Sequence, residues 1–509
     1  MPLTWSPVVL ALLLVAQVVR AKNDCGTRAC GSQSMAWGAK AGAADWCRRL
    51  QDNDKTLTSL LVMRTRAMTS ADWVEFCAAL ADNSALRELK ASSHKLDSPA
   101  LSAFSRMLAR NTALERLALG DAELGDAGVA LICDGLAANT ALKEIELDYK
   151  GLTPVGATAL ADALKKNRGL RRLVLSRNPD LGDAGVRALC ECLCESSVRD
   201  LQLEEVGMGD EGARALALAL AHSNTRMQEV SLCGNEALSG EGTGALVDAF
   251  LSGAGVESLK LDYCPQALSG NGSEKLQQLL RATSSPLHHL SIHTVIPPEE
   301  SRKALAAAVG ASTALLHAKL VNMDLGDAGV ACLSEALSAN PSSGLQVLDV
   351  TGNQATGDAA ACLFLSGNAP LAKVKRLVLF DNRVGTGASL PKLLEEAAQG
   401  GREVGVGLED LDLGGNKLEK AWILELLSAL YTCPGLFPAL RTLGLGGNEG
   451  MQDADPELEA AVEALQERAV PLDVVYRAMG DDGKAAADAR ASQLASQQLP
   501  GGADSSSQN

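Results

Sequence analysis

The chain has 509 residues, of which 47% are hydrophobic but only 3% are aromatic. Its formal net charge of −16 makes the surface acidic, so like-charge repulsion disfavours nucleic acids and anionic membranes as partners and favours basic proteins. The scarcity of aromatic residues is typical of thin layers packed with Leu, Ala and Val rather than of one bulky core.

The N-terminus carries an apolar segment at residues 7–19, followed by Arg20 and Ala21, which suit cleavage by a signal peptidase. The segment is shorter than the roughly 20 residues of a membrane-spanning helix. We therefore predict a signal peptide over residues 1–21, no stable membrane insertion after its removal, and a protein that is secreted or lies in the secretory-pathway lumen. Because no positive side chain precedes the segment, a buried or flexible N-terminus of a cytoplasmic protein is the alternative.

A cysteine-containing cap is predicted over residues 22–50, where Cys25, Cys30 and Cys47 precede the first repeat. A solenoid needs a cover for its first layer, and a disulfide-bonded cap suits an oxidising compartment. The remaining cysteines of the 13 follow no zinc or redox spacing, so we interpret them as small core residues.

A repeat that reads Leu-x-x-Leu-x-Leu, followed by a helix with apolar steps, extends over residues 51–479. Most steps are 28 or 29 residues, and such a period indicates a solenoid whose units bury their apolar faces against one another. The starting residues are Leu57, Leu86, Leu114, Leu142, Leu170, Val198, Met227, Val256, Leu287, Leu315, Leu345, Val374, Leu408 and Leu440.

Each unit combines a short strand with a helix. Leu117 and Leu119 alternate with polar or small residues, which predicts a strand with one buried face. Asp126 then stands where a carboxylate caps a helix N-terminus. The helix buries Ile132 and Leu136, four residues apart.

The same features recur in other units. Equivalent leucine pairs are Leu160 with Leu164, Leu189 with Leu193, Leu216 with Leu220, and Leu333 with Leu337. Asparagine tolerates the left-handed conformation that closes a helix, so five asparagines near helix ends are predicted stop signals. They are Asn111, Asn139, Asn167, Asn224 and Asn340.

The full pattern, Leu-x-x-Leu-x-Leu-x-x-Asn-x-Leu-Gly-Asp-x-Gly-x-x-x-Leu, is nearly complete at residues 170–189. It resembles the ribonuclease-inhibitor-like class of leucine-rich repeats. This resemblance implies an α/β horseshoe with parallel β-strands on the concave face and α-helices on the convex face. It also implies an asparagine whose side chain bonds the neighbouring turn, at Asn178, Asn235, Asn353, Asn382, Asn416 and Asn448. Other units hold His94, Ala122, Lys150, Val206, Cys264, Val295 or Met323 there, and cysteine is a substitution that the family uses.

The predicted concave face is the candidate partner-binding surface, and acidic residues prevail between Glu144 and Glu229. Tyr149 and Tyr263 are the candidate hot spots, because tyrosine combines rigid apolar area with a polar tip. The other polar candidates are Arg116, Glu144, Glu146, Asp148, Arg172, Asp200, Glu204, Glu205, Glu229, Lys260, Asp262, Arg376, Asp410 and Asp412. A solvated face whose charges only maintain solubility is the alternative.

Histidines form a second candidate patch on this face. His289, Ser291 and His293 point outward from one predicted strand. In the next unit His317 occupies the position equivalent to His289, and Lys319 is expected beside Ser291. His289 and His293 are too far apart along the strand to bind one metal ion together. The patch is interpreted as a pH-responsive contact surface, with ordinary solvated side chains as the alternative.

The C-terminal part departs from the regular period. Insertions at residues 400–405 and 433–438 are expected in loops, and a helix at 456–469 with a strand at 470–475 is expected to close the last layer. Residues 480–509 are rich in Ala, Gln, Gly and Ser and are predicted to be disordered. Asn271 begins the single glycosylation acceptor, which is usable only in the secretory pathway.

No catalytic, cofactor-binding or metal-binding motif is present in the sequence. We therefore predict a non-enzymatic protein that binds another protein across the concave face. A GTPase-activating protein similar to the Ran activator, a cytosolic inhibitor of a basic enzyme such as a ribonuclease, and an adaptor remain alternatives.

Overall fold

The computed structural model describes residues 42–475, apart from residues 67, 223–224, 367–370 and 452–454. Every described residue lies in one compact unit. The predicted signal peptide, the part of the predicted cap that holds Cys25 and Cys30, and the predicted tail at 480–509 lie outside the described residues. These three parts of the chain therefore stay predictions.

One parallel sheet runs through the described unit, and its 15 strands are paired strictly in chain order. Each of the 14 starting residues predicted from the sequence lies two residues before one of the first 14 strands. The strands are β1 (Ser59–Leu61), β2 (Glu88–Ala91), β3 (Arg116–Leu119), β4 (Glu144–Glu146), β5 (Arg172–Val174), β6 (Asp200–Gln202), β7 (Glu229–Ser231), β8 (Ser258–Lys260), β9 (His289–His293), β10 (His317–Val321), β11 (Val347–Asp349), β12 (Arg376–Val378), β13 (Asp410–Asp412), β14 (Thr442–Gly444) and β15 (Asp473–Val475).

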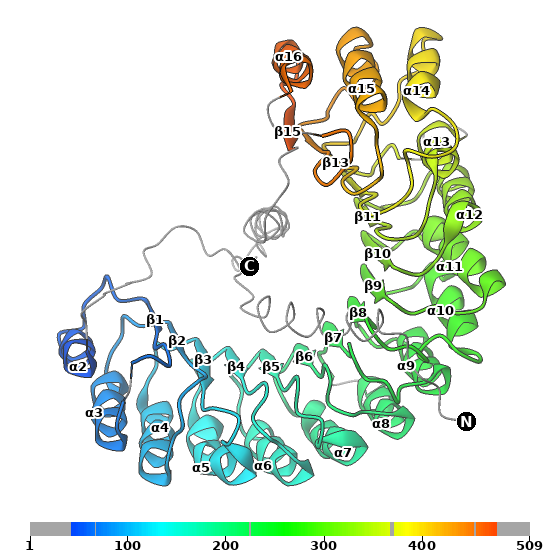
Figure 1. Cartoon of the computed structure of the whole chain (residues 1–509). Coiled ribbons are helices and arrows are strands. Elements are labelled where there is room, and N and C mark those ends of the chain that lie inside the picture. The colour runs from blue at the N-terminus through cyan, green and yellow to red at the C-terminus, as the bar shows by residue number, and fades with distance from the viewer. Residues whose placement is uncertain (1–41, 67, 223–224, 367–370, 452–454, 476–509) are drawn as a thin grey trace, which may run out of the picture. The chain divides into compact units, whose positions relative to one another are not determined.

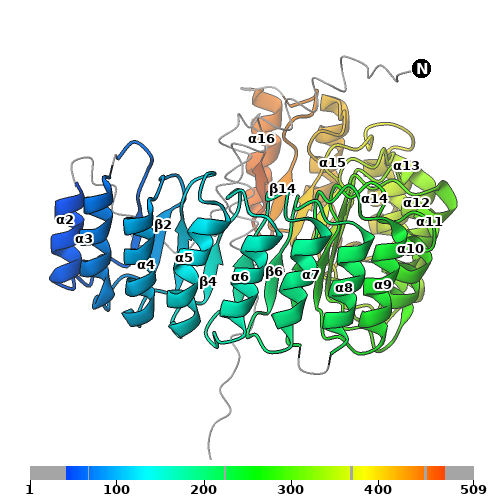
Figure 2. The same ribbon diagram turned by 90° about the horizontal axis from the view of Figure 1, so that it is seen from below.

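A helix precedes every strand, and within this unit the helices cover the outer, convex side while the strands line the inner, concave side (Figures 1 and 2). No helix in the described part of the chain is long and apolar enough to cross a membrane. The helices are α2 (Ala43–Gln51), α3 (Ser70–Ala81), α4 (Ser98–Arg110), α5 (Gly125–Ala138), α6 (Pro154–Leu164), α7 (Gly182–Leu193), α8 (Asp210–Leu220), α9 (Gly240–Leu251), α10 (Gly272–Arg281), α11 (Glu299–Ala311), α12 (Gly326–Ala339), α13 (Gly357–Leu365), α14 (Leu390–Gln399), α15 (Lys420–Thr432) and α16 (Pro456–Ala464), with a short 3-10 helix, η1 (Leu465–Glu467), after the last.

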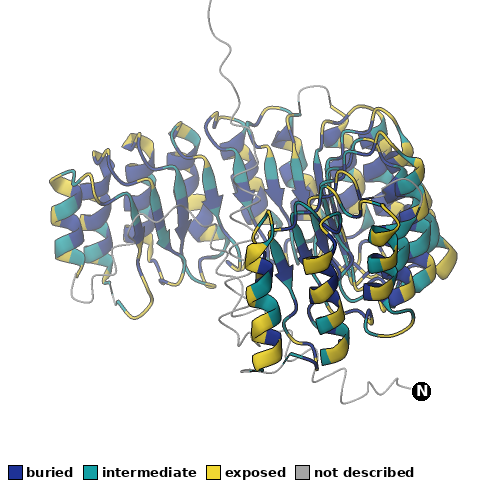
Figure 3. Cartoon of the chain, turned by 90° about the horizontal axis from the view of Figure 1, so that it is seen from above, coloured by how far each residue is buried: buried dark blue, intermediate teal, exposed yellow. Residues whose placement is uncertain are grey.

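The core is one continuous layer between sheet and helices, because every unit contributes the same apolar positions. Ile132 and Leu136 of α5 are fully buried, and the equivalent leucine pairs of α6, α7, α8 and α12 are buried as well, as predicted. Helix surfaces that face away from the sheet are exposed (Figure 3). Each layer therefore depends on its neighbours for burial.

An asparagine ladder follows the strands, which confirms the role implied by the repeat pattern. Asn382 donates from Nδ2 to the carbonyls of Val350 and Leu379, both at 3.0 Å, and its Oδ1 accepts the backbone N–H groups of Asn353 and Ala355 at 2.9 and 3.0 Å. Cys264 takes the same position in another unit and donates its thiol to the Leu232 carbonyl at 3.1 Å. We call Asn178, Asn235, Asn353, Asn382, Asn416 and Asn448 the post-strand ladder.

A second ladder precedes the strands, and it corrects the prediction for the asparagines near helix ends. Asn111 and Asn139 do end helices, but with φ of −69° and −75° their backbones are extended rather than left-handed. Each side chain instead binds the preceding unit: Asn111 Nδ2 donates to the carbonyls of Leu80 and Asn83 at 2.6 and 3.0 Å. Asn340 is likewise not left-handed, with φ of −113°. Asn83, Asn111, Asn139 and Asn167 form this pre-strand ladder, while Asn224 lies outside the described residues.

The repeated aspartate caps a helix, but the helix of the next unit rather than its own. Asp126 lies in the first turn of α5, and its Oδ1 accepts the backbone N–H groups of Thr153 and Gly156, both at 2.9 Å, at the start of α6. Asp183, Asp210 and Asp327 repeat this arrangement. The expectation of a cap within the same unit was wrong, because the positive-φ glycine before each of Asp126, Asp183 and Asp327 already turns the chain into the helix.

Helix α2 forms the described part of the predicted cap. It buries Trp46, Cys47 and Leu50 against the core, although Cys47 carries no disulfide. The other described cysteines are also unbridged and buried or half-buried, which agrees with their interpretation as small core residues.

Near the C-terminal end of the described chain, the two insertions contact each other at the edges of their repeats. The Val404 N–H donates to the Gly435 carbonyl at 3.0 Å. β15 closes the sheet as predicted. α16 ends at Ala464, five residues earlier than the predicted 469, and gives way to η1.

Candidate interaction surface

The strand register sets the candidate side chains in rows across the concave face. The first row runs through register partners on β2 to β10: Glu88, Arg116, Glu144, Arg172, Asp200, Glu229, Ser258, His289 and His317. The second row lies two residues further along each strand and comprises Lys90, Ala118, Glu146, Val174, Gln202, Ser231, Lys260, Ser291 and Lys319.

Ion pairs between neighbouring strands hold most charges of the first row. Arg172 lies between two carboxylates: its Nε is 3.0 Å from Glu144 Oε1, and its Nη1 pairs with Asp200. Arg116 Nε lies 3.5 Å from Glu88 Oε1. At the end of the acidic stretch, Lys260 Nζ lies 2.5 Å from Glu229 Oε1. The acidic candidates of this row are therefore largely neutralised by their own neighbours.

The carboxylates just beyond the strands are also engaged. Asp148 pairs with Arg177 at 2.7 Å, a partner that the sequence reading missed although it occupies the register position next to Tyr149. Glu204 accepts the Ser231 hydroxyl at 2.6 Å, and Asp262 accepts the Ser291 hydroxyl at 2.8 Å. Glu205 is half-buried at the next position.

Glu146 differs from these carboxylates. It is half-buried, and within the described part of the chain no hydrogen bond or ion pair reaches it. Burial raises the pKa of the Glu146 carboxyl. The charges of Lys90 and Arg172 oppose the rise, and the charges of Glu144 and Asp148 add to it.

The two tyrosines lie on the strand-end rim in an uncommon backbone conformation. Tyr149 is 61% exposed and Tyr263 is 38% exposed, and their φ angles of 55° and 58° lie in the left-handed region. Glycines take the same position after β7 and β11, at Gly234 and Gly352. Tyr149 follows β4 and Tyr263 follows β8, so the structure does not bring the two tyrosines into one contact site.

The histidines cluster as the register predicts. The rings of His289 and His317 lie 4.4 Å apart edge to face, and those of Tyr263 and His293 are also 4.4 Å apart. Asn322, which the sequence reading missed, places its Nδ2 2.9 Å from His293 Nε2. Lys319 is exposed beside this cluster.

Burial opposes a charge switch near neutral pH in the His289–His317 pair. Burial, with His289 and Lys319 adding to its effect, lowers the pKa of His317 to about 4. Burial, followed by the charge of His288, also lowers the pKa of His289. The pair is thus neutral at physiological pH, and the interpretation as a switch in that range needs a bound partner to restore the pKa. In the described residues, no group of three or more His, Cys, Asp or Glu side chains is arranged to hold a metal ion.

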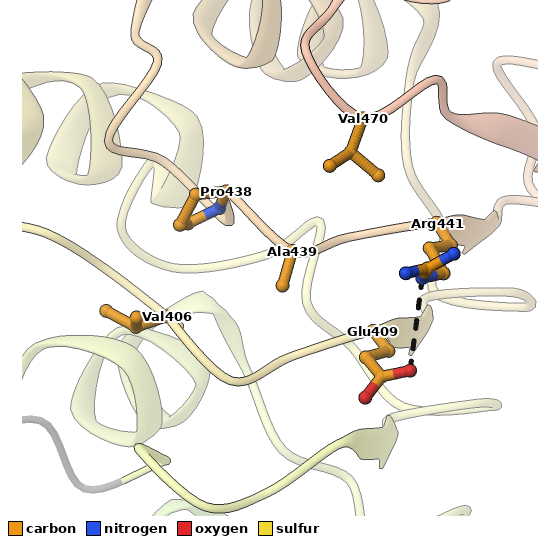
Figure 4. A pocket seen from close by; sticks show the side chains of 6 residues that line it. All are labelled: Val406, Glu409, Pro438, Ala439, Arg441 and Val470. Atoms are coloured by element: carbon orange, nitrogen blue, oxygen red, sulfur yellow. Dashed lines mark ion pairs between the residues drawn. The ribbon is translucent and has the colours of Figure 1, made fainter.

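The later units also carry an ion pair on the concave face. Arg376 Nε lies 3.5 Å from Asp410 Oδ2, and burial raises the pKa of both Asp410 and Asp412. Near the insertions lies an open pocket of about 350 Å³, in which Glu409 and Arg441 approach to 4.0 Å (Figure 4). Its other lining residues are Val406, Pro438, Ala439 and Val470.

The glycosylation acceptor lies away from these rows. Asn271 is exposed at the N-terminus of α10, whereas Ser273 is buried inside the first turn of that helix. Use of this acceptor stays a prediction.

A family model described as a leucine-rich repeat matches residues 166–190, which include β5 and Asn178. No curated protein matches the sequence. Among solved structures, the chain is similar to the actin-binding site 2 of leiomodin-1, with 19% identity over 31% of this chain and 90% of that one, at a TM-score of 0.27. It is also similar to a chain of the Rad7 and Elc1 complex from yeast, with 14% identity over 94% of this chain and 100% of that one, at a TM-score of 0.41. With 15 parallel strands alternating with helices and a leucine-rich-repeat match, the fold is an α/β leucine-rich-repeat solenoid.

Proposed function

We propose that this protein is a non-enzymatic interaction scaffold whose concave sheet face binds another protein, one that presents basic side chains. Tyr149 carries the proposal. A left-handed backbone costs a non-glycine residue roughly 1 kcal/mol, and the 61% exposed ring of Tyr149 recovers little of this from its own protein. Glycine would remove the cost, as it does at Gly234 and Gly352, so the retained ring supports a role in contact with a partner. Tyr263, whose ring packs against His293, is the second candidate on the same rim.

The test is to replace both tyrosines by glycine, which removes the rings and relieves the backbone. Thr294 provides the matched control, because it is exposed, has a φ of 56° in the equivalent turn and carries no ring. We expect the Thr294→Gly variant to be at least as stable as the unmodified protein. The Tyr149→Gly, Tyr263→Gly variant should stay folded, because the relief of two backbones offsets the loss of the ring contact between Tyr263 and His293. Quantitative mass spectrometry of affinity-purified material should show a protein retained by the unmodified chain and by Thr294→Gly but lost with the double variant. Equal retention by all three chains would contradict a concave binding site at these rings.

We also propose that the protein acts in the secretory pathway or outside the cell. Support comes from the apolar segment and cleavage signature at residues 7–21. Sequencing the N-terminus of protein from its native source should show a chain that begins near Lys22, while an intact Met1 would favour a cytoplasmic scaffold.

A further inference from the structure

The contact between β4 and β5 has three outward levels, and the middle level lacks a cation. At the first level Glu144 faces Arg172, and beyond the strands Asp148 pairs with Arg177. Between them, the register partner of Glu146 is Val174. A carboxylate is thus enclosed between two completed ion pairs, with an apolar neighbour where its own cation would stand.

Nearby cations of the chain are already engaged. Arg172 is shared by Glu144 and Asp200, and Arg177 is held by Asp148. In the second row the next cation toward the N-terminus is Lys90, which attracts Glu146 from two strands away but lies 3.5 Å from Glu88. The buried Lys150 donates from Nζ to the Ser92 carbonyl at 3.3 Å. A half-buried carboxylate without a direct ion-pair partner is unfavourable, so a cation supplied from outside would gain both the attraction and the relief of that cost.

The surroundings of Glu146 suit a long basic side chain. Ala118 and Val174 are its register partners on the two flanking strands, and both are small or apolar. They offer a floor for the methylene stem of a lysine or arginine, whose charged head then meets the carboxylate. Tyr149 lies three residues further along the same chain segment and is exposed.

We propose that a lysine or arginine of the protein partner docks on Glu146 and completes the β4–β5 series of ion pairs. The proposal rests on the proposed function, because it identifies the chemistry of the partner segment that the concave face accepts. Glu146 is a binding anchor, whereas Glu144, Asp200 and Glu229 serve the internal ion pairs.

The test uses a fluorescent octapeptide of alternating arginine and glycine, with the uncharged citrulline analogue as reference, titrated at low ionic strength and followed by anisotropy. Glu146→Gln removes the anchor. Glu300→Gln is the matched control, since it makes the same change of charge at a side chain that is 88% exposed on α11. Val174→Lys is a second, independent variant, because it supplies the missing cation within the chain itself.

We expect the arginine peptide to bind more tightly than the citrulline peptide, and Glu146→Gln and Val174→Lys each to weaken it more than about tenfold. Glu300→Gln should change affinity less than about twofold, because an exposed and screened charge contributes little. Both concave variants should melt at or above the temperature of the unmodified protein. Equal affinities for Glu146→Gln and Glu300→Gln, or for the arginine and citrulline peptides, would overturn the proposal. Either result leaves the tyrosine experiment untouched, so failure here is distinct from failure of the proposed function.

Discussion

The early and late units of the solenoid differ in the end of the strand at which most buried asparagines stand. Before the strands they stand mainly in the early units, at Asn83, Asn111, Asn139 and Asn167. After the strands they stand at Asn178 and Asn235 and then in each unit from β11 to β14, at Asn353, Asn382, Asn416 and Asn448. Each ladder pairs backbone groups that the thin core would otherwise bury without partners. Because Asn167 and Asn178 flank the same strand, β5, the two ladders satisfy different turns, and the balance between them shifts along the solenoid.

Removing one member of each ladder is the strongest way to break this comparison. Asn111→Ala and Asn382→Ala should each lower the free energy of unfolding by about 3 kcal/mol, because each change leaves several buried donors and acceptors without a hydrogen-bond partner. Equilibrium urea unfolding measures this loss. Since solenoid units contact only their neighbours, hydrogen exchange should accelerate around β2–β4 in the first variant and around β11–β13 in the second.

An exposed asparagine-to-alanine change supplies the control, and Asn271→Ala is suitable because that side chain is exposed, makes no capping hydrogen bond and belongs to neither ladder. A loss in Asn271→Ala as large as in the ladder variants would show that the change of residue type, rather than the buried hydrogen bonds, accounts for the effect.

The ion pairs on the concave face also differ between the early and the late units. Arg172 of the early units serves two carboxylates, whereas Arg376 of the late units has one, at 3.5 Å. Arg172→Ala should therefore cost about 2 kcal/mol, because it removes the paired cation from two half-buried carboxylates, and Arg376→Ala should cost less than about 1 kcal/mol. Thermal unfolding of both variants at matched salt measures the difference, and equal losses would mean that the second carboxylate adds nothing.

Much of the fold was predictable from the sequence, because its determinants are local and repeated. The starts of units from Leu57 to Leu440 and the buried helix leucines follow from period alone. The aspartate caps and the pre-strand ladder were predicted incorrectly, since Asp126 and Asn111 act between units. A single unit read in isolation contains no information on which neighbour a short polar side chain reaches.

The candidate surface was predictable as a set of positions but not as a set of interactions. Strand alternation placed Glu144, Glu146 and Arg172 on one face and set His289 beside His317. Whether a charge is neutralised depends on the residue across the register. That comparison separates Glu146 from Glu144, although the two glutamates look alike along the chain.

The smallest expected effect concerns the histidines that separate the early and late units. The folded pKa of His317 is about 4, below the ordinary value of 6.5, so the folded protein favours the neutral ring. The resulting stabilisation is fully present above pH 6.5 and is lost as the pH falls toward about 4, where the unfolded chain binds a proton that the folded chain does not. The slope is bounded by about 1.4 kcal/mol per pH unit and should be well below it, since the ring is only partly buried. His317→Gln should make the stability measured by urea unfolding depend less on pH between pH 4 and 6.5, and an unchanged slope would assign the dependence to other groups.

Two further variants serve as controls. Because the lowered pKa of His289 acts in the same direction, the double variant His289→Gln, His317→Gln should show a still smaller slope. Exchange of the exposed Lys319 for Gln should leave most of the slope in place.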